Sequence, residues 1–289
     1  MDRFTISDIE NISGIKAHTL RIWEKRYVIL VPKRKESNHR YYDNDDLKYI
    51  LQVAYLYKNG YKISKIAGLQ KDKLKDHIAA ATINDEQLLY QNILLSAAFE
   101  FDTSLFEETL HAAFEKLGFE KCILKVVYPY FEKVGLLWMN DEAIPAQEHF
   151  SSNIIRNKII NAIDKLQTPV GNIAPVILFT PDDEHHEIPL LFAHYLFKKH
   201  NKEVIYLGTN VSIDTLKDFC DEKKHGELFF NIITNFTGFS IDEYLMILCE
   251  TFPAQKIIMT GPLTNDITVR MPNCTLLTSL EQVIDFIKS

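Results

Sequence analysis

Glu184 and His186 stand two positions apart in a short polar segment, and together they have the chemistry of a metal-ligand pair. A neutral imidazole binds a metal through one ring nitrogen, and a carboxylate bonded to the other nitrogen fixes the tautomer and orientation of the ring. His185, Glu187 and His194 lie nearby and raise the alternative of zinc, but neither an HExxH motif nor a His/Cys ligand spacing is present. The segment therefore predicts one histidine ligand supported by a carboxylate.

A second group of chemically active side chains is basic and lies near the start of the chain. Helical spacing over about residues 16–27 places Ala17, Leu20 and Trp23 on an inward face. The outward face then carries long hydrogen-bond donors: His18, Arg21, Lys25 and Arg26. Such donors suit base edges and phosphate oxygens in a major groove, with a solvated basic face as the alternative.

The charge of the chain is divided unevenly. Of its 289 residues, the first 80 hold 16 Lys and Arg against 10 Asp and Glu, which leaves 16 against 29 for the remainder. A basic head on an acidic body is typical of a nucleic-acid-binding segment joined to a regulatory or assembly segment.

The elements around the basic helix predict a winged helix-turn-helix. Ser7 begins a capping-box pattern with Glu10, so a first helix is expected from Ser7 to Gly14, before the basic helix. A basic, aromatic-bearing hairpin is expected over residues 32–42, and Asp43 or the next residue then caps a further helix.

This run resembles the winged helix-turn-helix of the MerR family of transcription regulators. The matching stretches begin at Thr19 (TLRIWEKR), His39 (HRYY) and Asn59 (NGYKISKI). The resemblance implies contact with double-stranded promoter DNA from the basic helix and the wing, with Trp23 either at the DNA backbone or in the core. The candidate DNA-binding residues are His18, Arg21, Trp23, Lys25, Arg26, Arg34, Arg40 and Tyr41.

Residues 85–166 repeat apolar side chains at helical intervals, with breaks at Asp102, Gly118 and Asp141. This pattern predicts a four-helix bundle whose apolar residues are mostly core.

Trp138 and the pair Glu148 and His149 stand out within this bundle. They resemble the tryptophan and Glu-His pair of the helical cap that covers the upper face of cobalamin in the CarH, CarA and LitR group of light-responsive regulators. The alternative is a tryptophan that fills the bundle end and a Glu-His pair at a helix N-terminus, where a carboxylate interacts favourably with the helix dipole. Met139 departs from those light-responsive relatives that carry a histidine beside the tryptophan.

The last part of the chain alternates short apolar runs with amphipathic stretches. Strands are expected at residues 176–180, 203–207, 228–234, 256–260 and 274–277. This order predicts a doubly wound sheet, in which ligands bind at the carboxyl ends of the strands.

The Glu184-x-His186 segment follows the first of these strands. It resembles the Asp/Glu-x-His-x-x-Gly signature of cobalamin-binding domains, whose histidine binds cobalt from below. The resemblance implies that His186 is the cobalt ligand and that Thr234 and Gly261 line a slot for the nucleotide tail. Pro189 in place of the signature glycine, Thr234 in place of serine and Pro262 after Gly261 depart from the family pattern.

These features together predict a multidomain α and α/β chain. Its parts would be a winged helix-turn-helix over residues 1–75, a four-helix bundle cap over 85–166, and a Rossmann-like (flavodoxin-like) parallel sheet over 175–289. The resemblance implies a DNA-binding regulator, not an enzyme, that senses cobalamin, in particular adenosylcobalamin, by changing between homo-oligomers such as a dimer and a tetramer.

Two other interpretations remain open. One is a degenerate module that binds no corrinoid and serves assembly, protein interaction or another ligand. The other is a corrinoid-dependent methyltransferase component. No apolar run approaches the length of a membrane helix and no signal-peptide pattern begins the chain, so we expect a cytoplasmic protein.

Overall fold

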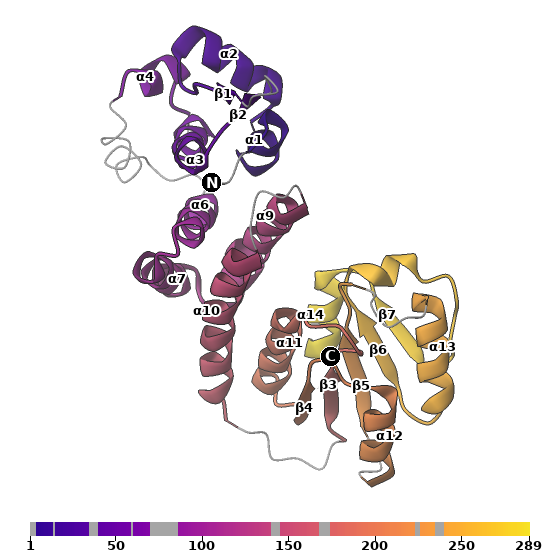
Figure 1. Cartoon of the computed structure of the whole chain (residues 1–289). Helices are drawn as coiled ribbons and strands as arrows, with labels where there is room; N and C mark the ends of the chain where they lie inside the picture. The colour runs from indigo at the N-terminus through magenta and orange to yellow at the C-terminus, as the bar shows by residue number, and fades with distance from the viewer. Residues whose placement is uncertain are drawn as a thin grey trace. The chain divides into compact units, whose positions relative to one another are not determined.

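The computed structural model of the chain divides into two compact units, Met1–Ser152 and Asn153–Ser289 (Figure 1). The division falls within one long helix, α10 (Pro145–Asp164), so each unit holds part of it. The structure describes residues 4–13, 15–34, 40–58, 60–69, 86–139, 145–167, 174–222, 226–234 and 240–289. Across these ranges no helix has both the length and the apolar character that crossing a membrane requires.

The amino-terminal part of the first unit is the expected winged helix-turn-helix. Its elements are α1 (Ile6–Ser13), α2 (Ala17–Tyr27), β1 (Lys33–Arg34), β2 (Arg40–Tyr41), α3 (Asn44–Lys58) and α4 (Ile63–Ala67). The first helix begins at Ile6, one residue before the predicted capping box, so Ser7 lies inside the helix. Leu20 and Trp23 of α2 are buried in the core that α2 shares with α1 and α3.

The wing is a short antiparallel hairpin in which Lys33 pairs with Tyr41 and Arg34 with Arg40. Asp43 caps the following helix, because its Oδ1 accepts a hydrogen bond of 3.1 Å from the backbone N–H of Asp46. The Lys33 ammonium forms ion pairs with both of these carboxylates. The base of the wing is therefore attached to the start of α3.

The rest of the first unit is helical, as predicted. It comprises α6 (Glu86–Phe99), α7 (Thr103–Leu117), α8 (Phe119–Cys122), the π-helical segment η2 (Ile123–Val127), α9 (Tyr128–Met139) and the first part of α10. Asp102 caps α7 and Gly118, at φ +80°, ends it, so these two of the three predicted breaks are confirmed. The third, Asp141, lies outside the described residues. Phe106 packs edge-to-face on Tyr130 and Phe150, with ring centroids 5.8 and 5.7 Å apart.

The second unit is a five-stranded parallel sheet in the order β4-β3-β5-β6-β7. The strands are β3 (Val176–Phe179), β4 (Val204–Gly208), β5 (Glu227–Asn231), β6 (Ile257–Thr260) and β7 (Cys274–Leu277). The helices are α11 (Glu187–Lys199), α12 (Ile213–Glu222), α13 (Ile241–Thr251), the 3₁₀ segment η3 (Pro262–Asp266) and α14 (Leu280–Lys288). This is the predicted doubly wound, flavodoxin-like topology.

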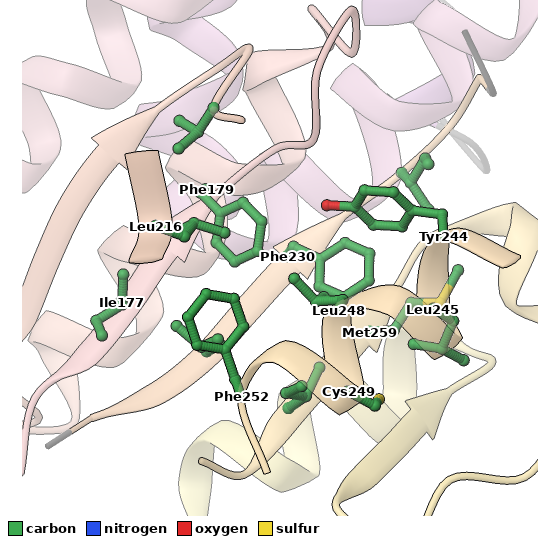
Figure 2. Packing of buried hydrophobic residues seen from close by; sticks show 14 residues of the cluster. Ile177, Phe179, Leu216, Phe230, Tyr244, Leu245, Leu248, Cys249, Phe252 and Met259 are labelled. Atoms are coloured by element: carbon green, nitrogen blue, oxygen red, sulfur yellow. The ribbon is translucent and has the colours of Figure 1, made fainter. Parts of the chain in front are cut away.

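Alternating side chains of the strands build a core on each face of the sheet. On the face covered by α12 and α13, the ring of Phe230 stacks on Phe179 and meets Tyr244 edge-to-face (Figure 2). On the face covered by α11, Phe197 packs edge-to-face on Phe229. Because both faces are covered, every residue of β3 is buried.

The strand order places β3 between β4 and β5, so the chain leaves β3 toward one side and continues at β5 on the other. The loops that follow β3 and β5 therefore meet at the carboxyl edge of the sheet, at the switch point where doubly wound sheets bind ligands. The strand β5, the third of this sheet along the chain, ends at Asn231, three residues before the predicted end. Thr234 therefore lies in the loop that follows the strand.

Candidate functional site

The Glu184 carboxylate is the centre of the site at this switch point. Its Oε1 accepts hydrogen bonds from the backbone N–H of His186, at 2.9 Å, and from the Nδ1 nitrogen of the same residue, at 2.6 Å. Its Oε2 accepts from the backbone N–H groups of Ile233 and Thr234 in the loop after β5, at 2.6 and 2.8 Å. The predicted Glu-His pair is thus assembled and joined to the neighbouring strand's loop.

The hydrogen bonds decide the ionisation of Glu184, which is 1% exposed. Burial alone would raise the pKa of this carboxyl, but the hydrogen bonds from His186, Thr234 and Ile233 outweigh it and lower the pKa to about 2. Glu184 is therefore a carboxylate at neutral pH, and the Nδ1 nitrogen of His186 must carry the proton between them. That tautomer leaves the lone pair on Nε2, the atom through which this imidazole would bind a metal.

Hydrogen bonds of Thr180 and Asn210 fix the conformation of the loop between β3 and His186. The Thr180 hydroxyl donates to the carbonyl of Glu184 at 2.5 Å and accepts from the N–H of Asn210 at 3.1 Å. The Asn210 side chain in turn accepts from the N–H of Asp183 at 2.8 Å, and both of these residues have positive φ. These bonds present Glu184 to the loop after β5.

Gly261 supports the same arrangement from β6. Its φ is +110°, and a Cβ atom there would lie 2.2 Å from the carbonyl oxygen of Ile232. Only glycine allows this approach, which fixes the backbone just before the two amides that hold Glu184. The glycine predicted to line a ligand slot therefore has a contact inside the protein that already requires it.

The three departures from the signature fit this backbone. Pro189 lies in the first turn of α11 and Pro262 begins η3, two places where a missing N–H breaks no helical hydrogen bond. The hydroxyl of Thr234 lies 3.4 Å from Glu184 Oε2, so it faces the carboxylate.

Asn231, the last residue of β5, carries an unsatisfied donor at the same edge of the sheet. The residue is 4% exposed, and its Nδ2 atom has no hydrogen-bond partner within the described part of the chain. A buried donor without an acceptor costs about 1–3 kcal/mol. An acceptor atom of a bound group would relieve that cost.

Of the residues predicted to cover the upper face of cobalamin, the structure describes the side chains of Glu148 and His149 but not that of Trp138. Glu148 and His149 lie in the first turns of α10, where Oε2 of the first is 3.1 Å from Nδ1 of the second, and the His149 side chain is 71% exposed. Trp138 and Met139 end α9, but their side chains lie outside the described residues. The structure thus pairs Glu148 with His149 and leaves their relation to Trp138 a prediction.

The predicted basic face of α2 is present. Four of the side chains assigned to it are exposed on the side of the helix opposite the core: His18, Arg21, Lys25 and Arg26. On the wing, Arg34 and Arg40 are exposed and face each other across the hairpin, and Tyr41 is half-buried. The two elements together form the candidate DNA-contacting surface.

Trp23 is a correction to the predicted DNA-binding set. It is 3% exposed and packs edge-to-face on Tyr57 of α3, with ring centroids 4.9 Å apart. A side chain so deeply enclosed cannot reach a DNA backbone, so the alternative of a core residue holds. Ile22, 46% exposed on the same face as Arg21, was not singled out from the sequence. An exposed apolar side chain among donors suits contact with a thymine methyl group.

The comparisons with known proteins agree with this organisation. A model described as MerR HTH family regulatory protein matches residues 4–73, and one described as B12 binding domain matches residues 90–161. The HTH-type transcriptional repressor CarH of Myxococcus xanthus is 24% identical over 220 residues, covering 74% of this chain and 73% of CarH. The repressor CarA of the same organism is 25% identical over 219 residues, covering 74% and 71%.

The chain carries the helix-turn-helix of MerR-type transcriptional regulators. It is homologous to CarH and CarA, which are transcriptional repressors, as the sequence led us to expect. A solved structure, the monomethylamine corrinoid protein of Methanosarcina barkeri, is similar over 68% of this chain and 95% of that chain, with 11% identity and a TM-score of 0.49.

The two backbone donors that the loop after β5 offers to Glu184 could not be predicted from the sequence. The amides of Ile233 and Thr234 belong to the backbone, so the residue types at these positions do not indicate their role.

The zinc alternative finds no support, since the described ranges contain no group of three or more His, Cys, Asp or Glu residues placed to hold a metal ion. One imidazole with one carboxylate is suited to a metal that brings most of its own ligands.

Proposed function

We propose that this MerR-type regulator binds a cobalamin at the carboxyl edge of its sheet and that the bound corrinoid controls its attachment to promoter DNA. The observation that carries the proposal is the Glu184–His186 pair, held by the backbone amides of the loop after β5. Because a corrinoid would bring most of the ligands of its cobalt, a single histidine from the protein would be sufficient. The match of residues 90–161 to the B12 binding domain supports the same cofactor.

The residues have distinct roles in this proposal. His186 would bind the cobalt through Nε2, while Glu184 keeps the proton on Nδ1 and holds the ring in place. Asn231 would donate its unsatisfied N–H to an acceptor on the ligand, next to the backbone that Gly261 positions. By the family resemblance, Glu148, His149 and Trp138 would be further corrinoid-binding residues. When bound, the corrinoid supplies a cobalt–carbon bond that light or chemical attack can break.

At the other end of the chain, α2 would enter the major groove of promoter DNA and the wing would contact the phosphate backbone. His18, Arg21, Lys25 and Arg26 would form the groove-facing set. Since linked heads that bind neighbouring half-sites gain affinity without new contacts, a ligand that changes the number of associated chains would switch DNA binding. We expect a homodimer or homotetramer to be the binding form.

The test is a dark reconstitution with adenosylcobalamin followed by gel filtration. The wild-type protein should retain the corrinoid and show the absorption spectrum of a base-off, histidine-ligated form. His186→Ala should lose that spectrum, whereas His185→Ala, at the exposed neighbouring histidine, should keep it. Dark and illuminated samples, run with and without cofactor, would give the oligomeric state and its response to light.

A wild-type protein that retains no corrinoid would refute the proposal. It would favour the degenerate module, in which the sheet unit serves assembly alone. A His186→Ala variant with an unchanged spectrum would place the cobalt elsewhere. Methyl transfer from bound methylcobalamin to an acceptor would instead support the corrinoid-dependent enzyme.

A further inference from the structure

Glu187, the residue directly after His186, joins three elements of the second unit. One carboxylate oxygen accepts a hydrogen bond from the Tyr206 hydroxyl of β4 at 2.9 Å. The other forms an ion pair with the Nε atom of Arg156 on α10. Because His186 occupies the N-cap position of α11 and Glu187 is the first residue of that helix, these contacts hold the backbone at His186.

The part of α10 that carries Arg156 contacts both ends of α11. Ile155, Ile159 and Ile163 recur every fourth residue and are 0, 0 and 8% exposed, so this side of the helix is buried. At the far end, the Lys198 ammonium donates to the carbonyl of Ile163 at 3.0 Å. Arg156 thus meets the beginning of α11 and Ile163 meets its end, so the two helices run in the same direction.

The Arg156–Glu187 pair differs from an ordinary surface ion pair, which contributes little because both partners are mobile and hydrated. The Glu187 side chain is 19% exposed and has a second fixed donor, Tyr206. The Tyr206 ring is itself held by stacking on His194, with ring centroids 5.2 Å apart. Burial and the nearby Glu187 carboxylate raise the pKa of Tyr206, so its hydroxyl remains a donor at neutral pH.

We propose that Glu187 is a positioning residue that couples ligand binding at His186 to the docking of α10 on α11. His186 and Glu187 are adjacent at the start of α11, so a contact that fixes the first turn of this helix also fixes His186. Through the ion pair of Glu187, it fixes Arg156 as well. The coupling is reciprocal: a ligand that binds His186 in its fixed position stabilises the docked α10, and a docked α10 favours the ligand. The inference rests on the proposed function, since the ligand in question is the corrinoid.

The consequence concerns how a cofactor signal leaves the sheet unit. α10 is continuous from Pro145 to Asp164, so the segment that Glu187 holds and the turn that carries Glu148 and His149 belong to one helix. The structure therefore assigns α10 as the element whose stability reports the state of His186.

Hydrogen exchange of the full-length protein, with and without adenosylcobalamin in the dark, tests this coupling. In the wild type, cofactor binding should slow amide exchange in residues 153–164. Glu187→Gln should exchange faster there without cofactor, should lose the cofactor-induced slowing, and should release the corrinoid about tenfold faster. Tyr206→Phe, which removes one hydrogen bond and keeps the ion pair, should show a smaller loss of the same kind.

Glu250→Gln is the matched control, because it removes the same charge from an exposed position on α13. It should leave exchange and corrinoid release unchanged. A wild type that retains corrinoid but whose residues 153–164 exchange equally with and without it would overturn the coupling alone. So would a Glu187→Gln or Tyr206→Phe protein that keeps the full cofactor-induced slowing. A wild type that retains no corrinoid would overturn the proposed function and this inference together.

Discussion

Replacing Glu184 with glutamine tests the central arrangement of the site. The carboxylate accepts from two donors of His186 through one oxygen and from the amides of Ile233 and Thr234 through the other. Glutamine has nearly the same shape but only one acceptor oxygen. If the NH₂ group turns toward the loop after β5, the amides of Ile233 and Thr234 lose their acceptor. If it turns toward His186, the backbone N–H of His186 loses its acceptor, and Nδ1 can accept from the NH₂ group only by giving up its proton.

The size of the effect follows from that count. A hydrogen bond to a charged group contributes about 1.5–3 kcal/mol, and a buried donor left unpaired costs about 1–3 kcal/mol. One or two donors are affected, so we expect Glu184→Gln to destabilise the sheet unit by about 1–5 kcal/mol. Because the proton on Nδ1 of His186 is no longer fixed, affinity for a metal at Nε2 should also fall, by about 10–100-fold.

Urea denaturation at neutral pH would measure the stability, and hydrogen exchange at the Ile233 and Thr234 amides would show whether the loss is local. Corrinoid retention after dark reconstitution would measure the second effect. Glu250→Gln again controls for the loss of one negative charge. If Glu184→Gln unfolds within about 0.5 kcal/mol of the wild type and its two loop amides exchange at the wild-type rate, the hydrogen bonds do not hold the site.

Three further results are expected. Burial and, to a smaller degree, Lys198 lower the pKa of His194 from 6.5 to about 4. The contribution of His194 to stability should therefore fall as pH drops through this interval, by about 3 kcal/mol at most and by less where solvent screens the partly exposed ring. Denaturation curves of His194→Phe should lack this part of the pH dependence. Gly261→Ala should lower stability by about 2–5 kcal/mol in thermal melts, since it combines strain at positive φ with a clash against the Ile232 carbonyl. An unchanged melting temperature would contradict the close approach of Gly261 to Ile232. The double substitution Arg21→Ala and Arg26→Ala should weaken promoter binding. Where both side chains contact phosphate, it should also reduce the slope of log K against log salt concentration by about two. A double variant that binds as tightly as the wild type at all salt concentrations would exclude both side chains from the interface.

Most of the fold could be predicted because the sequence marks it locally. Asp102 and Gly118 are residues whose capping chemistry and positive φ signal a helix boundary, and both proved to be boundaries. The five strands of the sheet unit are short apolar runs separated by amphipathic stretches, a pattern that only a covered parallel sheet explains well. The end of β5 was placed too far along because Ile232 and Ile233 continue the apolar run past the point where the strand stops at Asn231.

The site was only partly predictable, for a different reason. Glu184 and His186 are close in sequence, so their pairing follows from spacing. The partners on the far side of Glu184 are backbone amides about fifty residues later, and the Arg156–Glu187–Tyr206 contacts join three separate elements. Spacing says nothing about such contacts. Trp23 was ambiguous because an aromatic residue on a helix suits a core as well as an interface, and only its burial decides.

The four N–H groups that donate to Glu184 belong to the protein, so the imidazole of His186 is oriented before any ligand arrives. A binding site prepared in this way spends little entropy on ordering itself, and more of the gross interaction energy remains as affinity. The same preparation means that departure of the ligand need not dismantle the loop. The protein with and without ligand would then differ mainly in the elements that contact this loop. Rebinding of the cofactor would be fast, because the loop need not refold first.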